Sequence, residues 1–368
     1  MTRMAAPLLT IENLRTYFYS KSKQAFIRSV DDVNIEIAKG ETLGVVGESG
    51  SGKSVTALSV MGLVSAGPGV ISGKIGFTAE RAQINLLQDI DKYVKITRDG
   101  GKIMNVQKDI VGWGKNIDHV MSDVRGKEIA MIFQNPQSSF NPFTTVGKQI
   151  TEAILLHTGA KNAPEARERA VSWLDRVKID SPRLRFDSHP FDLSGGMCQR
   201  AMIAMALASE PSLLIADEPT TGLDATIQST IVDLLAELKA ELGITTMLIS
   251  HDISIISRLS DSVAVMYGGT IVEYGPAADI LVSGFASKHP YTAALLASIP
   301  SAQNITEKGY LQPIEGDVLD TINIPEGCRF FSRCNRMTGA VREKCERKEP
   351  DLREIGQKHQ VRCWLYFD

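Results

Sequence analysis

Residues 47–54 have the types and spacing of a loop that binds phosphate. The segment GESGSGKS fits the pattern G-x-x-x-x-G-K-[ST], with a short apolar run before it and a helical pattern after it. Its glycines let backbone N–H groups face phosphate oxygens at a helix N-terminus. We expect Lys53 to neutralise phosphate charge and the Ser54 hydroxyl to bind Mg²⁺. The residues predicted to contact the nucleotide here are Gly47, Ser49, Gly50, Ser51, Gly52, Lys53 and Ser54.

Two carboxylates follow a second apolar run, LLIA, at residues 213–216. Open α/β sheets place their chemistry at the carboxyl ends of their strands. At such an end Asp217 can hold Mg²⁺ through water, and Glu218 can polarise a water that attacks a terminal phosphate. An acidic pair alone is more commonly a strand end that meets solvent, so this interpretation depends on the neighbouring motifs.

Residues 193–200, LSGGMCQR, precede a helical segment and lie just upstream of the acidic strand. Small residues there expose backbone N–H groups at a helix N-terminus, which suits a phosphate. LSGG before a helix, between a phosphate loop and a D-E strand, resembles the signature of ABC ATPases. The resemblance implies that Ser194, Gly195 and Gly196 receive the γ-phosphate of an ATP held by a partner subunit.

Other loops resemble ABC ATPase motifs one at a time. Gln134 in MIFQNP resembles the Q-loop glutamine that touches Mg²⁺ and water, and Asp224 in TTGLD matches the D-loop. His251 follows the apolar strand TTMLIS and resembles the switch histidine that contacts the γ-phosphate. An aromatic side chain is expected to stack on adenine, and spacing favours Phe18 over the tyrosines on either side of it.

Longer segments are similar to the D-type ATPase of oligopeptide and dipeptide importers: QRAMIAMALA, LLIADEPTT, MYGGTIVEYG and HPYTAALLASIP. The resemblance implies ATP hydrolysis that powers solute uptake, with the chain bound peripherally at the cytoplasmic face of the inner (plasma) membrane. The implied partners are an F-type ABC ATPase, two transmembrane permease subunits and an extracytoplasmic solute-binding protein.

Two departures from this group leave the solute open. Cys198 stands where a basic residue is usual, and the segment 77–126 is longer than the usual connection to the Q-loop. Relatives of the group also carry oligosaccharides, glutathione or nickel.

Two other classes of function fit the sequence less well. A soluble ABC ATPase of DNA repair would have a long coiled coil before the signature, and one of translation would have two cassettes; the chain has one phosphate loop and no heptads there. A noncatalytic binding module conflicts with the presence of both Glu218 and His251.

The elements that position these motifs alternate between strand and helix. Residues 8–36 predict antiparallel strands around a polar turn at 20–24, and 43–46, 213–216 and 245–249 predict buried strands. Helical patterns cover 151–176, with a start at Asn162, and 227–242. The predicted class is α/β: a RecA-like parallel sheet, an antiparallel β subdomain and a helical signature subdomain at about 140–205.

Two segments depart from this scheme. Residues 77–126 show little helical periodicity, and we expect a surface insertion containing a hairpin that turns at 99–101. The pattern changes again after about residue 280. We therefore expect a cassette at 1–280 and a small Cys-rich C-terminal domain at 281–368.

Four of the five cysteines lie near the C-terminus: Cys328, Cys334, Cys345 and Cys363. Disulfides are disfavoured in a reducing compartment, and four thiolates suit either zinc or a 4Fe-4S cluster. The resemblance to dipeptide-importer ATPases favours the cluster, whose charge Arg329, Arg333 and Arg336 would offset, and leaves zinc or unligated cysteines as the alternatives. Because this site is far in sequence from the nucleotide motifs, its loss is expected to affect the C-terminal unit before ATP chemistry.

Composition agrees with a globular protein without a nucleic-acid partner. Forty Lys and Arg residues nearly balance 43 Asp and Glu residues, so no overall field attracts nucleic acid or anionic lipid. We find no signal peptide and no apolar stretch of the roughly 20 residues needed for a membrane span, which predicts a cytosolic chain.

Overall fold

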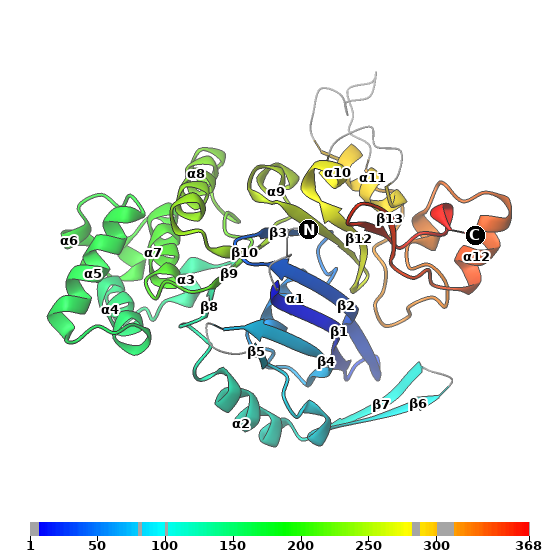
Figure 1. Cartoon of the computed structure of the whole chain (residues 1–368), viewed down its shortest axis with the longest axis horizontal. Coiled ribbons are helices and arrows are strands. Elements are labelled where there is room, and N and C mark those ends of the chain that lie inside the picture. The colour runs from blue at the N-terminus through cyan, green and yellow to red at the C-terminus, as the bar shows by residue number, and fades with distance from the viewer. Residues whose placement is uncertain (1–6, 80–82, 100–101, 282–287, 300–312, 368) are drawn as a thin grey trace, which may run out of the picture.

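The computed structural model describes residues 7–79, 83–99, 102–281, 288–299 and 313–367. Two large sheets form its centre (Figure 1). The first is antiparallel, in the order β2 (Ala25–Ala38), β1 (Pro7–Ser20), β4 (Pro68–Thr78) and β5 (Gln83–Asn85). The alternating pattern at 8–36 predicted its two long strands, and this prediction is confirmed.

The second sheet has the parallel centre predicted from the short apolar runs. Five parallel strands lie side by side: β11 (Ser262–Tyr267), β3 (Thr42–Val46), β10 (Thr245–Ile249), β9 (Leu213–Asp217) and β8 (Ile129–Ile132). All residues of β3, β9 and β10 are buried. Alternate residues of β9 pack in two different apolar clusters, Leu213 and Ile215 in one and Leu214 and Ala216 in the other. Both faces of the sheet are therefore covered, which is why these strands are continuously apolar.

Helices flank the sheet and form a separate group on one side (Figure 1). α1 (Lys53–Val60) follows β3, α8 (Ala225–Leu242) follows β9, and α9 (Ile253–Leu259) follows β10. The helical group consists of α3 (Pro136–Ser139), α4 (Val146–His157), α5 (Ala163–Arg176), α6 (Pro182–Phe186), η2 (Pro190–Asp192) and α7 (Gly195–Leu207). The Asn162 side chain accepts a hydrogen bond from Glu165 N and caps α5, as the sequence predicted. In the part of the chain that the structure describes, no helix is both long and apolar enough to cross a bilayer.

The segment 77–126 contributes to the core, in contrast to the expected surface insertion. β5 extends the antiparallel sheet, followed by η1 (Ile90–Lys92), the hairpin β6 (Val94–Asp99) and β7 (Lys102–Lys108), and α2 (Ile110–Met121). The hairpin is confirmed, although Gly100 and Gly101 of its turn lie outside the described residues. Trp113, Ile117 and Met121 of α2 are buried in the core cluster between the sheets.

The expected separate C-terminal domain is not supported. β12 (Thr270–Pro276) pairs with β14 (His359–Val361), which pairs with β13 (Arg353–Gly356), so the end of the chain extends the main sheet. Cys328, Phe330 and Trp364 belong to the same apolar cluster as the helices around α7. The remaining helices here are α10 (Ala277–Leu281), α11 (Pro290–Ala297), η3 (Phe331–Arg333), α12 (Gly339–Arg347) and η4 (Trp364–Tyr366).

Candidate functional site

The predicted phosphate loop connects the end of β3 to the start of α1. Three of its glycines have positive φ, 151° at Gly47, 79° at Gly50 and 104° at Gly52, and at Gly47 and Gly52 there is also no room for a side chain. A Cβ at Gly47 would lie 2.2 Å from Met266 O, and one at Gly52 would lie 2.2 Å from Ser29 O. Both positions therefore require glycine for steric as well as conformational reasons.

The Lys53 side chain is buried and folds back over this loop. Its Nζ donates to Gly47 O at 2.7 Å and to Glu48 O at 3.0 Å. Burial lowers the pKa of Lys53, while the nearby carboxylates of Glu218, Asp217 and Glu48 act in the opposite direction. Among the described residues, the ammonium group has only these two backbone carbonyls as hydrogen-bond acceptors. A charged phosphate oxygen would be a stronger acceptor than either carbonyl.

Ser54 and Asp217 meet although they are far apart in sequence. Ser54 Oγ donates to Asp217 Oδ1 at 2.9 Å. Burial raises the pKa of Asp217, and Glu218 adds to this effect. A hydroxyl beside a buried carboxylate is the pair of oxygen ligands that Mg²⁺ prefers, so these residues fit the predicted metal position.

Glu218 is the centre of a second group of contacts. Gln134 Nε2 and Thr221 Oγ1 each donate to Glu218 Oε2 at 2.9 Å, and His251 Nδ1 lies 3.4 Å from Oε1. Gln134 follows β8, Glu218 follows β9 and His251 follows β10, so three adjacent parallel strands deliver these side chains to one edge. Glu218 itself has a left-handed backbone with φ of 48°, and its N–H donates to Ile249 O at 2.9 Å. An unusual backbone held by the next strand is typical of a residue positioned for function.

The signature and D-loop residues lie at two helix starts that pack together. Ser194 caps α7 by accepting from Met197 N, and Asp224 caps α8 by accepting from Ile227 N. A Cβ at Gly196 would lie 2.8 Å from Ile227 Cγ2, so Gly196 allows the close approach. Figure 1 shows α7 in the helical group and α1 at the centre of the molecule. The chain thus separates its own signature, including Gly195, from its own phosphate loop.

The structure narrows the choice of adenine-stacking aromatic. Tyr17 is buried and its hydroxyl donates to Asp31 Oδ1 at 2.5 Å, so its ring packs in the core and is not accessible to an adenine ring. Phe18 is half-buried and Tyr19 is 48% exposed. Phe18 remains the predicted residue, with Tyr19 as its neighbour on the strand.

The four C-terminal thiols are near one another but do not form the predicted metal site. Cys328 N donates to Cys345 O at 2.7 Å. Burial raises the pKa of the Cys328 thiol to about 12, and the neighbouring cysteines Cys345, Cys363 and Cys334 add to the shift. Among the described residues no three Cys, His, Asp or Glu side chains are arranged to hold a metal ion. The structure therefore does not support the predicted 4Fe-4S or zinc site.

Contacts between the C-terminal region and the nucleotide motifs were not predicted from the sequence. Arg329 and Arg333 were expected to offset thiolate charge, but they pair with carboxylates. Arg329 Nη2 donates to Asp31 Oδ2 at 2.9 Å, and Arg333 forms a bidentate pair with Glu48 of the phosphate loop. The C-terminal region, which is far from the nucleotide motifs in sequence, therefore contacts the phosphate loop in space.

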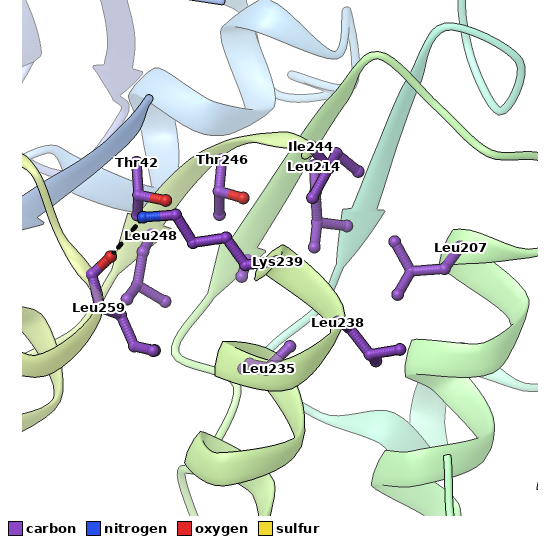
Figure 2. A pocket seen from close by; sticks show the side chains of 11 residues that line it. Thr42, Leu207, Leu214, Leu235, Leu238, Lys239, Ile244, Thr246, Leu248 and Leu259 are labelled. Atoms are coloured by element: carbon purple, nitrogen blue, oxygen red, sulfur yellow. Dashed lines mark hydrogen bonds between the residues drawn. The ribbon is translucent and has the colours of Figure 1, made fainter. Parts of the chain in front are cut away.

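A small cavity between α8 and the main sheet is unrelated to this site (Figure 2). Its volume is about 20 Å³ and its lining is mostly aliphatic, with Leu235 and Leu238 of α8, Leu207 of α7 and Leu248 of β10 among the lining residues. The Lys239 ammonium at its edge donates to Leu259 O at 3.1 Å. A gap of this size in an apolar layer is a packing feature of the core.

Family models match most of the chain. The model of the ABC transporter family matches residues 30–221. A second model, the C-terminal region of oligopeptide/dipeptide transporters, matches residues 272–345. Two solved structures share the fold. The dimeric bacterial ABC transporter cassette MJ0796 is 25% identical, with a TM-score of 0.56, and the match covers 73% of this chain and 98% of that one. The structure of cbiO1 of Clostridium perfringens is 26% identical, with a TM-score of 0.53, and the match covers 76% of this chain and 92% of that one.

Full-length relatives are more similar. The oligopeptide transport ATP-binding protein AppD of Bacillus subtilis is 40% identical over 98% of this chain and 97% of its own length. A putative peptide import ATP-binding protein of Brucella abortus is 39% identical over 97% of this chain and 96% of its own. With the motifs assembled as described and the match extending along almost the whole chain, this protein belongs to the ABC transporter family, within its group of peptide-import ATP-binding proteins.

Proposed function

We propose that this chain is the ATP-hydrolysing subunit of an importer for oligopeptides or dipeptides. The observation that carries the proposal is the position of Glu218, which Gln134, Thr221 and His251 hold at the same sheet edge as Asp217. A carboxylate there can polarise water for attack on a γ-phosphate. The relatives named as peptide import proteins support peptides as the solute.

Each side chain has a separate task in this reaction. Lys53 neutralises the β- and γ-phosphate oxygens, and the backbone N–H groups of the loop bind them. Ser54 and Asp217 hold Mg²⁺, which supplies positive charge to stabilise the developing phosphate charge. Gln134 and His251 orient the water and the γ-phosphate around Glu218. Phe18 stacks on the adenine.

Two nucleotides are sandwiched between this subunit and an F-type ABC ATPase partner. In this arrangement Ser194, Gly195 and Gly196 meet the partner's γ-phosphate, and Asp224 crosses the interface. The separation of α7 from α1 supports the proposal, because the signature and phosphate loop of one chain then serve two different sites. The related cassette MJ0796 was solved as a dimer.

The assembly also contains two transmembrane permease subunits and an extracytoplasmic solute-binding protein, with this chain bound at the cytoplasmic face of the inner (plasma) membrane. Large apolar side chains exposed in the helical group support a docking role: Phe143, Leu155, Leu156, Leu184 and Phe191. Such residues are unusual on a free surface when they gather in one region.

We also propose that the four C-terminal cysteines bind a structural 4Fe-4S cluster, with zinc as the alternative, which would require their side chains to take an arrangement other than the one described above. Their gathering in one part of the fold supports this proposal. When bound, the cluster would cross-link segments 328–334, 345 and 363. No step of ATP hydrolysis involves it.

The test is reconstitution of this subunit with its F-type partner, the permeases and the binding protein in lipid vesicles. We expect poor ATP hydrolysis by the isolated subunit, and strong hydrolysis with peptide uptake by the full assembly. Full activity of a strict monomer would contradict the shared site. If an oligosaccharide and not a peptide stimulates ATP hydrolysis, the proposed solute is wrong but the proposed ATPase role stands.

A further inference from the structure

The phosphate-loop residue Glu48 is held by the C-terminal region at both its side chain and its backbone. Arg333 Nη1 donates to Glu48 Oε2 at 2.7 Å and Nη2 donates to Oε1 at 3.0 Å. Glu48 N donates to Tyr291 Oη at 2.8 Å. The Arg333 side chain is 2% exposed and that of Glu48 is 21% exposed, so the guanidinium is shielded from solvent while the carboxylate is partly accessible. Paired, charge-assisted hydrogen bonds of this kind are stronger and more directional than neutral ones.

Arg333 is itself held in place by several contacts within the C-terminal region and with Tyr267. Its Nε donates to Glu315 O at 2.9 Å, and its Nη2 also reaches Ile314 O at 3.3 Å. The guanidinium carbon lies 5.7 Å from the centre of the Tyr267 ring and 5.8 Å from that of Phe330. These contacts leave the guanidinium one orientation, facing Glu48.

The charge of Glu48 lies close to the place where phosphates are expected. Lys53 Nζ donates to Glu48 O, and the negative charge of the Glu48 carboxylate acts to raise the pKa of Lys53, against the effect of burial. A carboxylate at this position would repel the phosphates of ATP and compete with them for the Lys53 ammonium. Arg333 supplies the compensating positive charge.

We propose that Arg333 is a positioning residue for ATP binding, which neutralises Glu48 and holds the phosphate loop in its binding shape. The inference rests on the proposed function, in that ATP is the ligand of this loop. It assigns to the C-terminal region a direct part in nucleotide affinity. Arg333 touches Glu48 and does not need to touch the nucleotide.

The experiment compares Mg–ATP dissociation constants by calorimetry for the full chain and three variants: Arg333→Gln, the double variant Arg333→Gln with Glu48→Gln, and Arg347→Gln as a matched control. Arg347 is exposed and its side chain pairs with Glu343. We expect Arg333→Gln to weaken ATP binding by about tenfold or more, because it leaves an unpaired carboxylate beside the phosphates. The double variant should recover most of that loss, and Arg347→Gln should bind as the parent chain does.

Two further readings separate a charge effect from a loss of folding. The deficit of Arg333→Gln should shrink as salt is added, since screening weakens the repulsion. Thermal unfolding without nucleotide shows whether the variants remain folded. Equal ATP affinity in folded Arg333→Gln, or an equal loss in the single and double variants, would overturn the proposal. Failure of the unmodified chain to bind ATP would overturn the proposed function as well.

Discussion

Gln134 and Glu218, separated by 84 residues, are joined by a hydrogen bond of 2.9 Å from the amide Nε2 to the carboxylate Oε2. Thr221 Oγ1 donates to the same oxygen, while Oε1 faces His251. The glutamine follows one strand and the glutamate the next, so a shift of β8 relative to β9 would alter this contact. The carboxylate that we propose as water-polarising is therefore oriented by its neighbours on both oxygens.

Replacement of that carboxylate should separate binding from chemistry. We expect Glu218→Gln to keep Mg–ATP affinity, since the amide oxygen can still accept from Gln134 and Thr221. Turnover in the assembled transporter should fall by about 10²–10⁴, the usual cost of losing a general base. Glu237→Gln is the matched control, because Glu237 is an exposed residue of α8 that pairs with Lys178. Near-normal turnover by Glu218→Gln would show that another residue polarises the attacking water.

Loss of the Lys53 ammonium should act earlier, on binding itself. Its hydrogen bonds to Gly47 O and Glu48 O place the charge inside the loop. We expect Lys53→Ala to weaken Mg–ATP binding by at least tenfold, because phosphate charge is then left without its main counter-charge. Lys74→Ala, which removes an exposed lysine paired with Glu12, provides the comparison. Calorimetric titration of both variants measures the difference, and equal affinities would refute the role.

The parallel core and the motifs on it were predictable because their signals are local. Runs such as 43–46 and 213–216 are apolar throughout, and the chemistry-bearing residues follow them directly along the chain. The helix α2 was missed although Trp113, Ile117 and Met121 recur every four residues. Gly112 and Gly114 lie within the same turns, and glycine lowers helix propensity enough to obscure such a pattern.

Contacts between distant segments had no local signal. Glu48 and Arg333 are 285 residues apart, and neither has a sequence environment that identifies its partner. The pairing of β12 with β14 depends on a strand of three residues, too short to show alternation. The C-terminal region therefore looked separate in sequence, whereas burial of its apolar residues joins it to the core.

The two signature glycines should differ in their tolerance of a methyl group. A Cβ at Gly196 would lie 2.8 Å from Ile227 Cγ2, whereas the nearest atom to a Cβ at Gly195 is Leu223 Cδ2 at 3.5 Å. Overpacking costs about 1–3 kcal/mol, and alanine returns up to about 1 kcal/mol of helix propensity. We expect Gly196→Ala to lower the free energy of unfolding, and Gly195→Ala to leave it equal or higher. Denaturant unfolding of the subunit measures both, and equal stability of the two variants would contradict the α7–α8 contact.

The cysteines provide a test of the proposed cluster. If the four C-terminal thiols bind 4Fe-4S, protein purified without oxygen should be brown and contain about four iron atoms per chain. Cys345→Ser should lose the colour, because one of four ligands is removed. Cys198→Ser is the control, since Cys198 lies in α7, on the opposite side of the molecule from α12 (Figure 1), and the iron content of this variant should not change. A colourless protein that contains one zinc per chain would show that the four cysteines bind zinc and not an iron-sulfur cluster. Four free thiols without metal would exclude both the cluster and the zinc site. Because Arg333 adjoins Cys334 and holds Glu48, loss of a true ligand should also weaken ATP binding, more than Cys198→Ser does.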